Sequence, residues 1–169
     1  MVGEWGELFN DMRIKNRGIS GDVCMGVYDR LEPITRGKSA KLFLMIGIND
    51  MAQEPHIDSI AFQTGIILER IKSASPQTQV YLQSVLPVND CYGLFDNHTK
   101  HWGKINPLNV QLQQLAESKK ITFIDLYSHF TEVNSKKMDP IYTNDGLHLM
   151  GKGYMRWIEI IKSYISENR

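Results

Sequence analysis

The chain has 169 residues, of which 42% are apolar and 22% charged, as in an ordinary globular protein. Nineteen basic side chains balance nineteen acidic ones, which argues against nucleic acid or an anionic membrane as the main partner. No apolar run approaches the roughly 20 residues of a transmembrane helix, and the two cysteines do not make a disulfide framework. We therefore expect one compact domain over residues 1–169.

The first part of the chain predicts a helix, a strand and a second helix. Apolar residues in 5–9 have helical spacing, whereas residues 12–16 alternate between apolar and polar, which is typical of a half-exposed strand. Apolar positions at helical spacing between 24 and 31 then predict a helix that Pro33 ends.

The remainder alternates between buried strands and amphipathic helices. Strands are predicted at 41–47, 79–88 and 121–127, and helices over 57–71, 105–116 and 154–165. Strands separated by helices imply a parallel sheet that is covered on both faces. The longest irregular stretch, 88 to about 103, is predicted to be either a lip over a site or a plain surface loop.

Polar segments with glycine follow several of the predicted strands, at the sheet edge where α/β proteins bind ligands. In "NRGISGD" (16–22), the Gly21 N–H is open to close approach by a substrate oxygen. For this segment taken alone, a helix N-cap formed by Ser20 or Asp22 is the better interpretation. In "IGIND" (46–50), Asn49 offers an amide donor to a developing oxyanion, with an Asx-turn as the alternative.

The segment "YTNDGLHLMGKGY" (142–154) contains an Asp-x-x-His pair. This spacing lets the Asp145 carboxylate accept from one imidazole nitrogen of His148, which leaves the other nitrogen free as a general base. A metal ligand pair and a solvated loop are the alternatives. No histidine or cysteine lies nearby at coordinating spacing, and "HTKH" (98–101) is interpreted as a polar loop, so we expect no metal and no cofactor.

Together these segments supply two oxyanion donors, a base and an acid that orients the base. This is the equipment of acyl transfer without a nucleophile.

In this combination and order, "NRGISGD", "IGIND", "QSVLPVN" and "YTNDGLHLMGKGY" closely resemble the GDSL, or SGNH, hydrolases. The resemblance is nearest to the platelet-activating-factor acetylhydrolase-like and sialate O-acetylesterase-like branch. It implies a flavodoxin-like three-layer α/β/α sandwich that hydrolyses small-molecule esters, often acetyl esters of a carbohydrate or a lipid. By position, Gly21 and Asn49 match the family's oxyanion donors, and Asp145 and His148 match its acid and base.

The chain departs from the family pattern at the first block, which ends the first strand and carries the nucleophilic serine. Residues 3–9 resemble the segment that follows this block, so the serine is expected upstream of Met1. Ser20, Ser84 and Ser128 are not expected to replace it. The missing strand would lie between 12–16 and 41–47, which predicts an altered sheet or a homo-oligomer.

Two questions stay open on the sequence. A signal peptide would lie upstream of Met1, so the compartment is left undecided. A non-catalytic module that binds glycans or lipids on the same fold is the main alternative to an esterase. A nucleotide-binding protein is disfavoured, because 16–22 lacks the several glycines of a phosphate-cradling loop.

Overall fold

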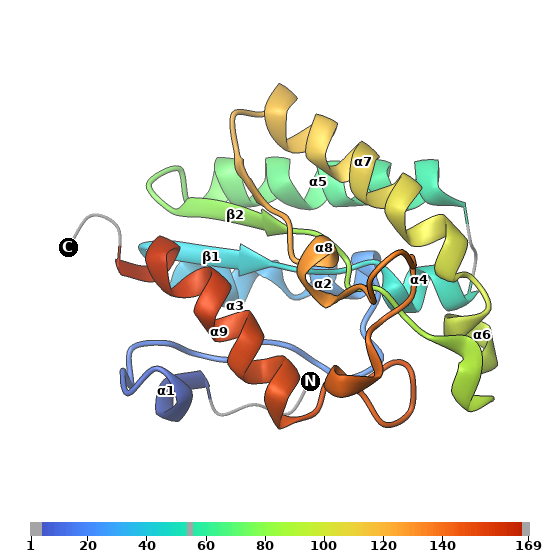
Figure 1. Cartoon of the computed structure of the whole chain (residues 1–169). Helices are drawn as coiled ribbons and strands as arrows, with labels where there is room; N and C mark the ends of the chain where they lie inside the picture. The colour runs from blue at the N-terminus through green and yellow to red at the C-terminus, as the bar shows by residue number, and fades with distance from the viewer. Residues whose placement is uncertain (1–4, 54–55, 167–169) are drawn as a thin grey trace.

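The computed structural model describes residues 5–53 and 56–166, so the first two residues of the segment 3–9 lie outside the described residues. A parallel sheet forms the middle layer (Figure 1), and its strands are β1 (Lys41–Leu44), β2 (Gln79–Gln83) and β3 (Thr122–Ile124), in that spatial order. The predicted α/β fold with a parallel sheet is therefore confirmed.

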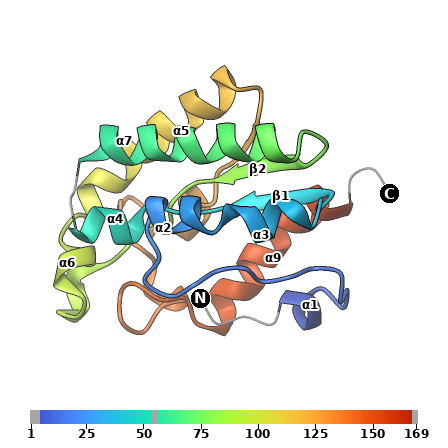
Figure 2. The same ribbon diagram turned by 180° about the vertical axis from the view of Figure 1, so that it is seen from behind.

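Helices cover both faces of the sheet. One face carries α2 (Cys24–Asp29), α3 (Leu31–Arg36), α5 (Ile57–Ala74) and α7 (Trp102–Ser118), and the view from behind shows α2, α3 and α5 in front of the strands (Figure 2). The other face carries α1 (Trp5–Leu8), α8 (Tyr127–Phe130) and α9 (Gly151–Ser166). The shorter elements are α4 (Ile48–Gln53), α6 (Asp96–Thr99), η1 (Asp90–Tyr92) and η2 (Pro140–Tyr142).

The strand register explains why two hydrophobic cores form. Successive strand residues point to opposite faces, and β2 accordingly places Tyr81 in the cluster beneath α9 and Leu82 in the cluster beneath α5 and α7. Phe43 pairs with Tyr81 in the β1–β2 register, and their rings stack with centroids 4.6 Å apart. Both faces of this short sheet therefore carry apolar side chains that pack beneath helices, which is the pattern that "KLFL" predicts.

The strand predicted at 12–16 does not form. The segment is irregular, its first turn is closed by a hydrogen bond from the Ile14 N–H to the Asp11 carbonyl, and Arg13 pairs with Asp11. Both views show this blue stretch running apart from β1 (Figures 1 and 2), so β1 is an edge strand of the described sheet. Alternation alone does not make a strand, because the backbone groups also need a neighbouring strand to pair with.

The helix predicted between 24 and 31 is interrupted at Arg30, where φ is −106° and ψ is 16°. The prediction that Pro33 ends a helix is wrong, because Pro33 lies inside α3. It is tolerated there because it falls in the first turn, where the backbone N–H groups have no intrahelical acceptor.

The second and third strands are shorter than predicted for a specific reason. The Ser84 hydroxyl, directly after β2, accepts the N–H groups of Leu126 and Tyr127, each at 2.8 Å. The Ser84 side chain thus replaces the backbone as the acceptor of these N–H groups. The chain beyond β3 continues into α8 and does not extend the strand. None of the described helices is long and apolar enough to cross a bilayer.

The packing of α7 against the sheet predicts that two nearby substitutions on this helix differ greatly in their effect on the free energy of unfolding. Leu112 is fully buried, whereas Val110, two residues earlier on α7, is 48% exposed. Leu112→Ala is expected to lower the free energy of unfolding by about 2–5 kcal/mol, because it removes buried methyl groups and leaves a cavity. Val110→Ala is the control and should change it by less than about 0.5 kcal/mol. Urea denaturation measures both, and equal values would contradict this assignment of the core.

Candidate active site

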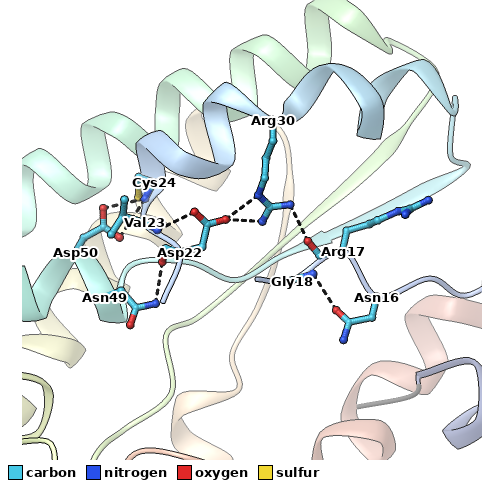
Figure 3. A network of polar contacts seen from close by, with 9 residues as sticks. All are labelled: Asn16, Arg17, Gly18, Asp22, Val23, Cys24, Arg30, Asn49 and Asp50. Carbon is cyan, nitrogen blue, oxygen red and sulfur yellow. Dashed lines mark hydrogen bonds and ion pairs between the residues drawn. The ribbon is translucent and has the colours of Figure 1, made fainter. Parts of the chain in front are cut away.

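The segments after β1 and before α2 are joined by two hydrogen bonds (Figure 3). The Asn49 side-chain Nδ2 donates to the Asp22 carbonyl at 2.8 Å, and the Asp50 carboxylate accepts the Cys24 N–H at 2.9 Å. Asp50 therefore satisfies the first N–H of α2, whose N-cap residue is Val23 with no side-chain cap bond. The N-cap by Ser20 or Asp22 and the Asx-turn that the sequence allowed are not what the structure forms.

Gly21 lies one residue before the carbonyl that Asn49 contacts. Its φ of +77° is the left-handed conformation that glycine adopts without strain, and a Cβ built there meets no atom within 4 Å. The residue is exposed, so its backbone is open to an approaching ligand. The structure thus brings two of the predicted site residues, Gly21 and Asn49, into adjacent positions.

An arginine fixes the course of the loop that holds Gly21. Arg30 donates to the Asp22 carboxylate from Nε at 2.8 Å and from Nη2 at 2.5 Å, and its Nη1 donates to the Arg17 carbonyl at 2.7 Å. Figure 3 shows Arg30, between α2 and α3, reaching toward both Asp22 and Arg17. A planar two-pronged contact of this kind holds a loop more firmly than a single hydrogen bond.

Asp145 and His148 form a hydrogen-bonded pair at the start of α9. Asp145 Oδ2 lies 2.7 Å from His148 Nδ1, and Asp145 Oδ1 accepts the N–H groups of Leu147 and His148 at 2.9 and 2.8 Å. Burial by itself would raise the pKa of Asp145, but these hydrogen bonds outweigh it and hold the pKa below its usual value. Asp145 is therefore an anion at neutral pH, and an anion at Nδ1 favours the tautomer that leaves Nε2 as the basic nitrogen.

Gly146 locks this pair against the segment that follows β2. Its carbonyl accepts the Asn89 N–H at 2.8 Å, and its φ is +83°. A Cβ at this position would lie 1.9 Å from the Asn89 carbonyl oxygen, which no side chain tolerates. Glycine is required here both for its backbone conformation and for the close approach.

A connection between the two halves of the site was not predicted. His98, on α6, places Nε2 3.1 Å from Asn49 Oδ1, and the Phe95 ring lies edge-on to His148 with centroids 5.1 Å apart. The stretch 98–101 was interpreted as a polar loop, and no cluster of metal-ligating side chains occurs among the described residues. The sequence carries no local signal for the contact of His98 with Asn49, because the two residues are 49 positions apart.

No described serine hydroxyl forms a hydrogen bond with the ring of His148. Ser84 is buried and already accepts two backbone N–H groups, and Ser20 and Ser128 are exposed. Cys24 is no substitute, because burial and then the nearby Asp50 charge raise the pKa of its thiol to about 12. The catalytic roles of the four predicted site residues, Gly21, Asn49, Asp145 and His148, stay predictions.

A separate pocket of about 240 Å³ opens beside α7 and α8. Its lining mixes polar residues such as Asn106, Gln113 and Asp125 with apolar ones, and it includes none of the four predicted site residues.

Comparison with known proteins identifies the family of this chain. The model of the GDSL-like Lipase/Acylhydrolase family matches residues 3–156, and the chain therefore belongs to this family of acylhydrolases. Ester hydrolysis is the chemistry that this membership supports in general terms.

Solved structures agree with this assignment. A protein described as a candidate platelet activating factor from Streptococcus pneumonia is 28% identical, with a TM-score of 0.82, over 96% of this chain and 77% of that chain. A GDSL-like lipase from Bacteroides thetaiotaomicron VPI-5482 is also 28% identical, with a TM-score of 0.78, over 90% of this chain and 75% of that chain.

One curated protein is similar as well. The N-acylneuraminate cytidylyltransferase of Escherichia coli O18:K1:H7 (strain RS218 / NMEC) is 25% identical over 148 residues, which cover 86% of this chain. The match takes in 33% of that protein, so the chain spans about a third of the length of this relative.

The close contact of Gly146 with Asn89 predicts that alanine destabilises the protein more at position 146 than at another glycine with positive φ. Gly146→Ala combines a positive φ with a collision against the Asn89 backbone, whereas Gly93→Ala, at φ +63° with no atom within 4 Å of the new Cβ, has only the positive φ. We expect Gly93→Ala to lower the free energy of unfolding by about 1 kcal/mol and Gly146→Ala by at least about 3 kcal/mol. Thermal denaturation compares them, and similar losses would rule out the close packing described here.

The two cysteines predict a simple chemical test. Cys91 is exposed, and Cys24 is buried with a raised pKa. Because the thiolate is the reactive form, a disulfide reagent such as DTNB should modify one thiol promptly in the native protein at pH 8 and the second only after unfolding. Cys91→Ser should abolish the prompt phase, and prompt modification of both thiols would contradict the buried position of Cys24.

Proposed function

We propose that this chain supplies the base, the orienting acid and the oxyanion donors of a serine esterase. The observation that carries the proposal is the hydrogen bond between Asp145 and His148 on the same edge of the sheet as the contact of Asn49 with the Asp22 carbonyl, next to Gly21. The substrates would be O-acetyl or other short acyl esters of a carbohydrate or a lipid. Relatives named for N-acylneuraminate and for platelet activating factor favour these two classes of alcohol.

In the proposed reaction, His148 handles the proton. Because Nδ1 donates to Asp145, the lone pair on Nε2 takes the proton of a serine hydroxyl as its oxygen attacks the ester carbonyl. The same proton then passes to the alcohol oxygen as the ester bond breaks, which leaves an acyl-enzyme. Water attacks the acyl-enzyme in the second half of the reaction, again with Nε2 as the base, and releases the acid and the free serine.

The negative charge on the carbonyl oxygen would be met by two donors. The Gly21 N–H is accessible because the residue lacks a side chain and is exposed. Asn49 uses Nδ2 to donate to the Asp22 carbonyl, and the second hydrogen on that nitrogen is available for the oxyanion. Donors that are fixed before the charge develops are commonly the largest contribution to such catalysis.

The nucleophile is proposed to be a serine supplied from outside these 169 residues. Two observations support this: no described serine hydrogen-bonds the His148 ring, and β1 is an edge strand of the described sheet. A strand added there would end at the same sheet edge as Asn49.

Esterase assays with p-nitrophenyl acetate test the proposal. The 169-residue chain should show negligible turnover, and a chain extended with its natural upstream sequence should be active. In the extended chain, His148→Gln should lower kcat by at least about 10³, because the base is lost. His129→Gln is the matched control, since His129 is an exposed histidine that contacts Arg156.

Equal rates for the short and extended chains, or equal rates for the two histidine variants, would overturn these roles. Binding of a glycan or lipid by the extended chain without turnover would instead establish the non-catalytic module.

A further inference from the structure

We propose that His98, on α6, is a positioning residue for the oxyanion donor Asn49, and that Phe95, directly before this helix, connects the donor to the base. The catalytic part of this inference rests on the proposed function. The geometric part, the contacts of His98 and Phe95, is independent of it. It assigns a role to a segment that sequence analysis interpreted as a loop.

The first step is the orientation of the Asn49 amide. The Asp22 carbonyl can only accept a hydrogen bond, so the Asn49 nitrogen must face it, as the Nδ2–O distance of 2.8 Å shows. The Asn49 oxygen then faces His98, at 3.1 Å from Nε2. An oxygen acceptor requires His98 to carry its proton on Nε2, so the Asp22 backbone fixes the histidine tautomer through the asparagine side chain.

The second step is what the His98 contact adds. With one partner on each side, the Asn49 side chain cannot rotate about its last bond without breaking two hydrogen bonds. Its remaining N–H therefore keeps one direction. Without His98 the amide would retain only the Asp22 contact, and the donor would have to be oriented at each turnover.

The third step connects this donor to the base. Phe95 precedes α6 in a left-handed conformation, with φ of +54°, which is uncommon for a residue with a bulky side chain. Its ring lies edge-on to His98, with centroids 6.4 Å apart, and edge-on to His148, with centroids 5.1 Å apart. The short segment 95–99 thus contacts the donor through His98 and the base through Phe95.

Electrostatics agree with a neutral His98. Burial, and then the charge of His148, lower the pKa of His98 below its ordinary value. Neutral His98 adds no second positive charge beside the base when His148 becomes protonated during the reaction. Its Nε2–H still donates to Asn49 in this state.

Nuclear magnetic resonance on the 169-residue chain tests the geometry without any turnover. With isotope-labelled histidine, His98 should show the Nε2–H tautomer. His98→Leu should shift or broaden the Asn49 side-chain amide signal, and His98→Gln should restore it, because glutamine keeps an N–H donor. His101→Leu is the control, since His101 lies on the same segment and has no hydrogen bond to Asn49 in the described structure. An Nδ1–H tautomer, or equal changes in His98→Leu and the control, would overturn the positioning role.

Kinetics on the extended, active chain test the consequence. His98→Leu should lower kcat by about tenfold with little change in KM, which is part of the 10²–10³ that a whole oxyanion donor contributes. His98→Gln should recover most of this loss, and His101→Leu should resemble the unaltered enzyme. An active chain in which His98→Leu has no effect on kcat would refute the inference and leave the proposed function intact. An extended chain with no esterase activity would refute the proposed function, and the resonance result alone would then decide the role of His98.

Discussion

The arrangement of the site depends on the hydrogen bonds of the Asn49 side-chain amide. It comes from the first turn of α4, directly after β1, and its two ends reach different segments: the Asp22 carbonyl before α2 and the His98 ring on α6. Its neighbour Asp50 accepts the first N–H of α2, so two consecutive side chains connect α4 to the start of α2. Parts of the chain that are far apart in sequence therefore meet at one edge of the sheet, where parallel strands deliver their loops.

Each supporting loop is in turn fixed by a group that has no chemical role in the proposed reaction. Arg30 braces the loop before α2, and the close contact of Gly146 with the Asn89 backbone braces the loop before α9. The Ser84 hydroxyl takes the N–H groups beyond β3 and so turns the chain away from the sheet. These contacts keep flexible side chains at defined positions, which is what preorganised donors and a directed base require.

The sequence predicted the parts of this structure that depend on local pattern. The amphipathic stripe of 57–71 and the apolar run at 41–47 are strong signals, and α5 and β1 formed there. The prediction of a strand at 12–16 was wrong, because alternating apolar and polar residues give no information about a neighbouring strand to pair with. The sequence did not predict the break at Arg30 or the position of Pro33 within α3. A proline is common both just after one helix and in the first turn of the next, so the sequence does not distinguish the two.

The site was predictable where one short segment contains the whole interaction. Asp145 and His148 are three residues apart, so their contact is visible in the sequence, and the family resemblance supplied Gly21 and Asn49. The contact of His98 with Asn49 spans 49 positions and comes from a segment with no strong periodicity. Nothing in the local pattern distinguishes that histidine from His101, and only the fold does so.

The loop before α9 also has a bearing on the chemical ageing of the protein. Asp145 is followed by Gly146, a dipeptide in which the glycine nitrogen readily attacks the aspartate carboxyl to give a succinimide and then isoaspartate. In the folded chain the Gly146 nitrogen donates to Thr143 Oγ1 at 2.9 Å, while the carboxylate is held by the Leu147 and His148 N–H groups. These hydrogen bonds thus also give each of the two groups that would react another partner. Storage conditions that loosen this loop would move the carboxylate onto a lengthened backbone and away from His148.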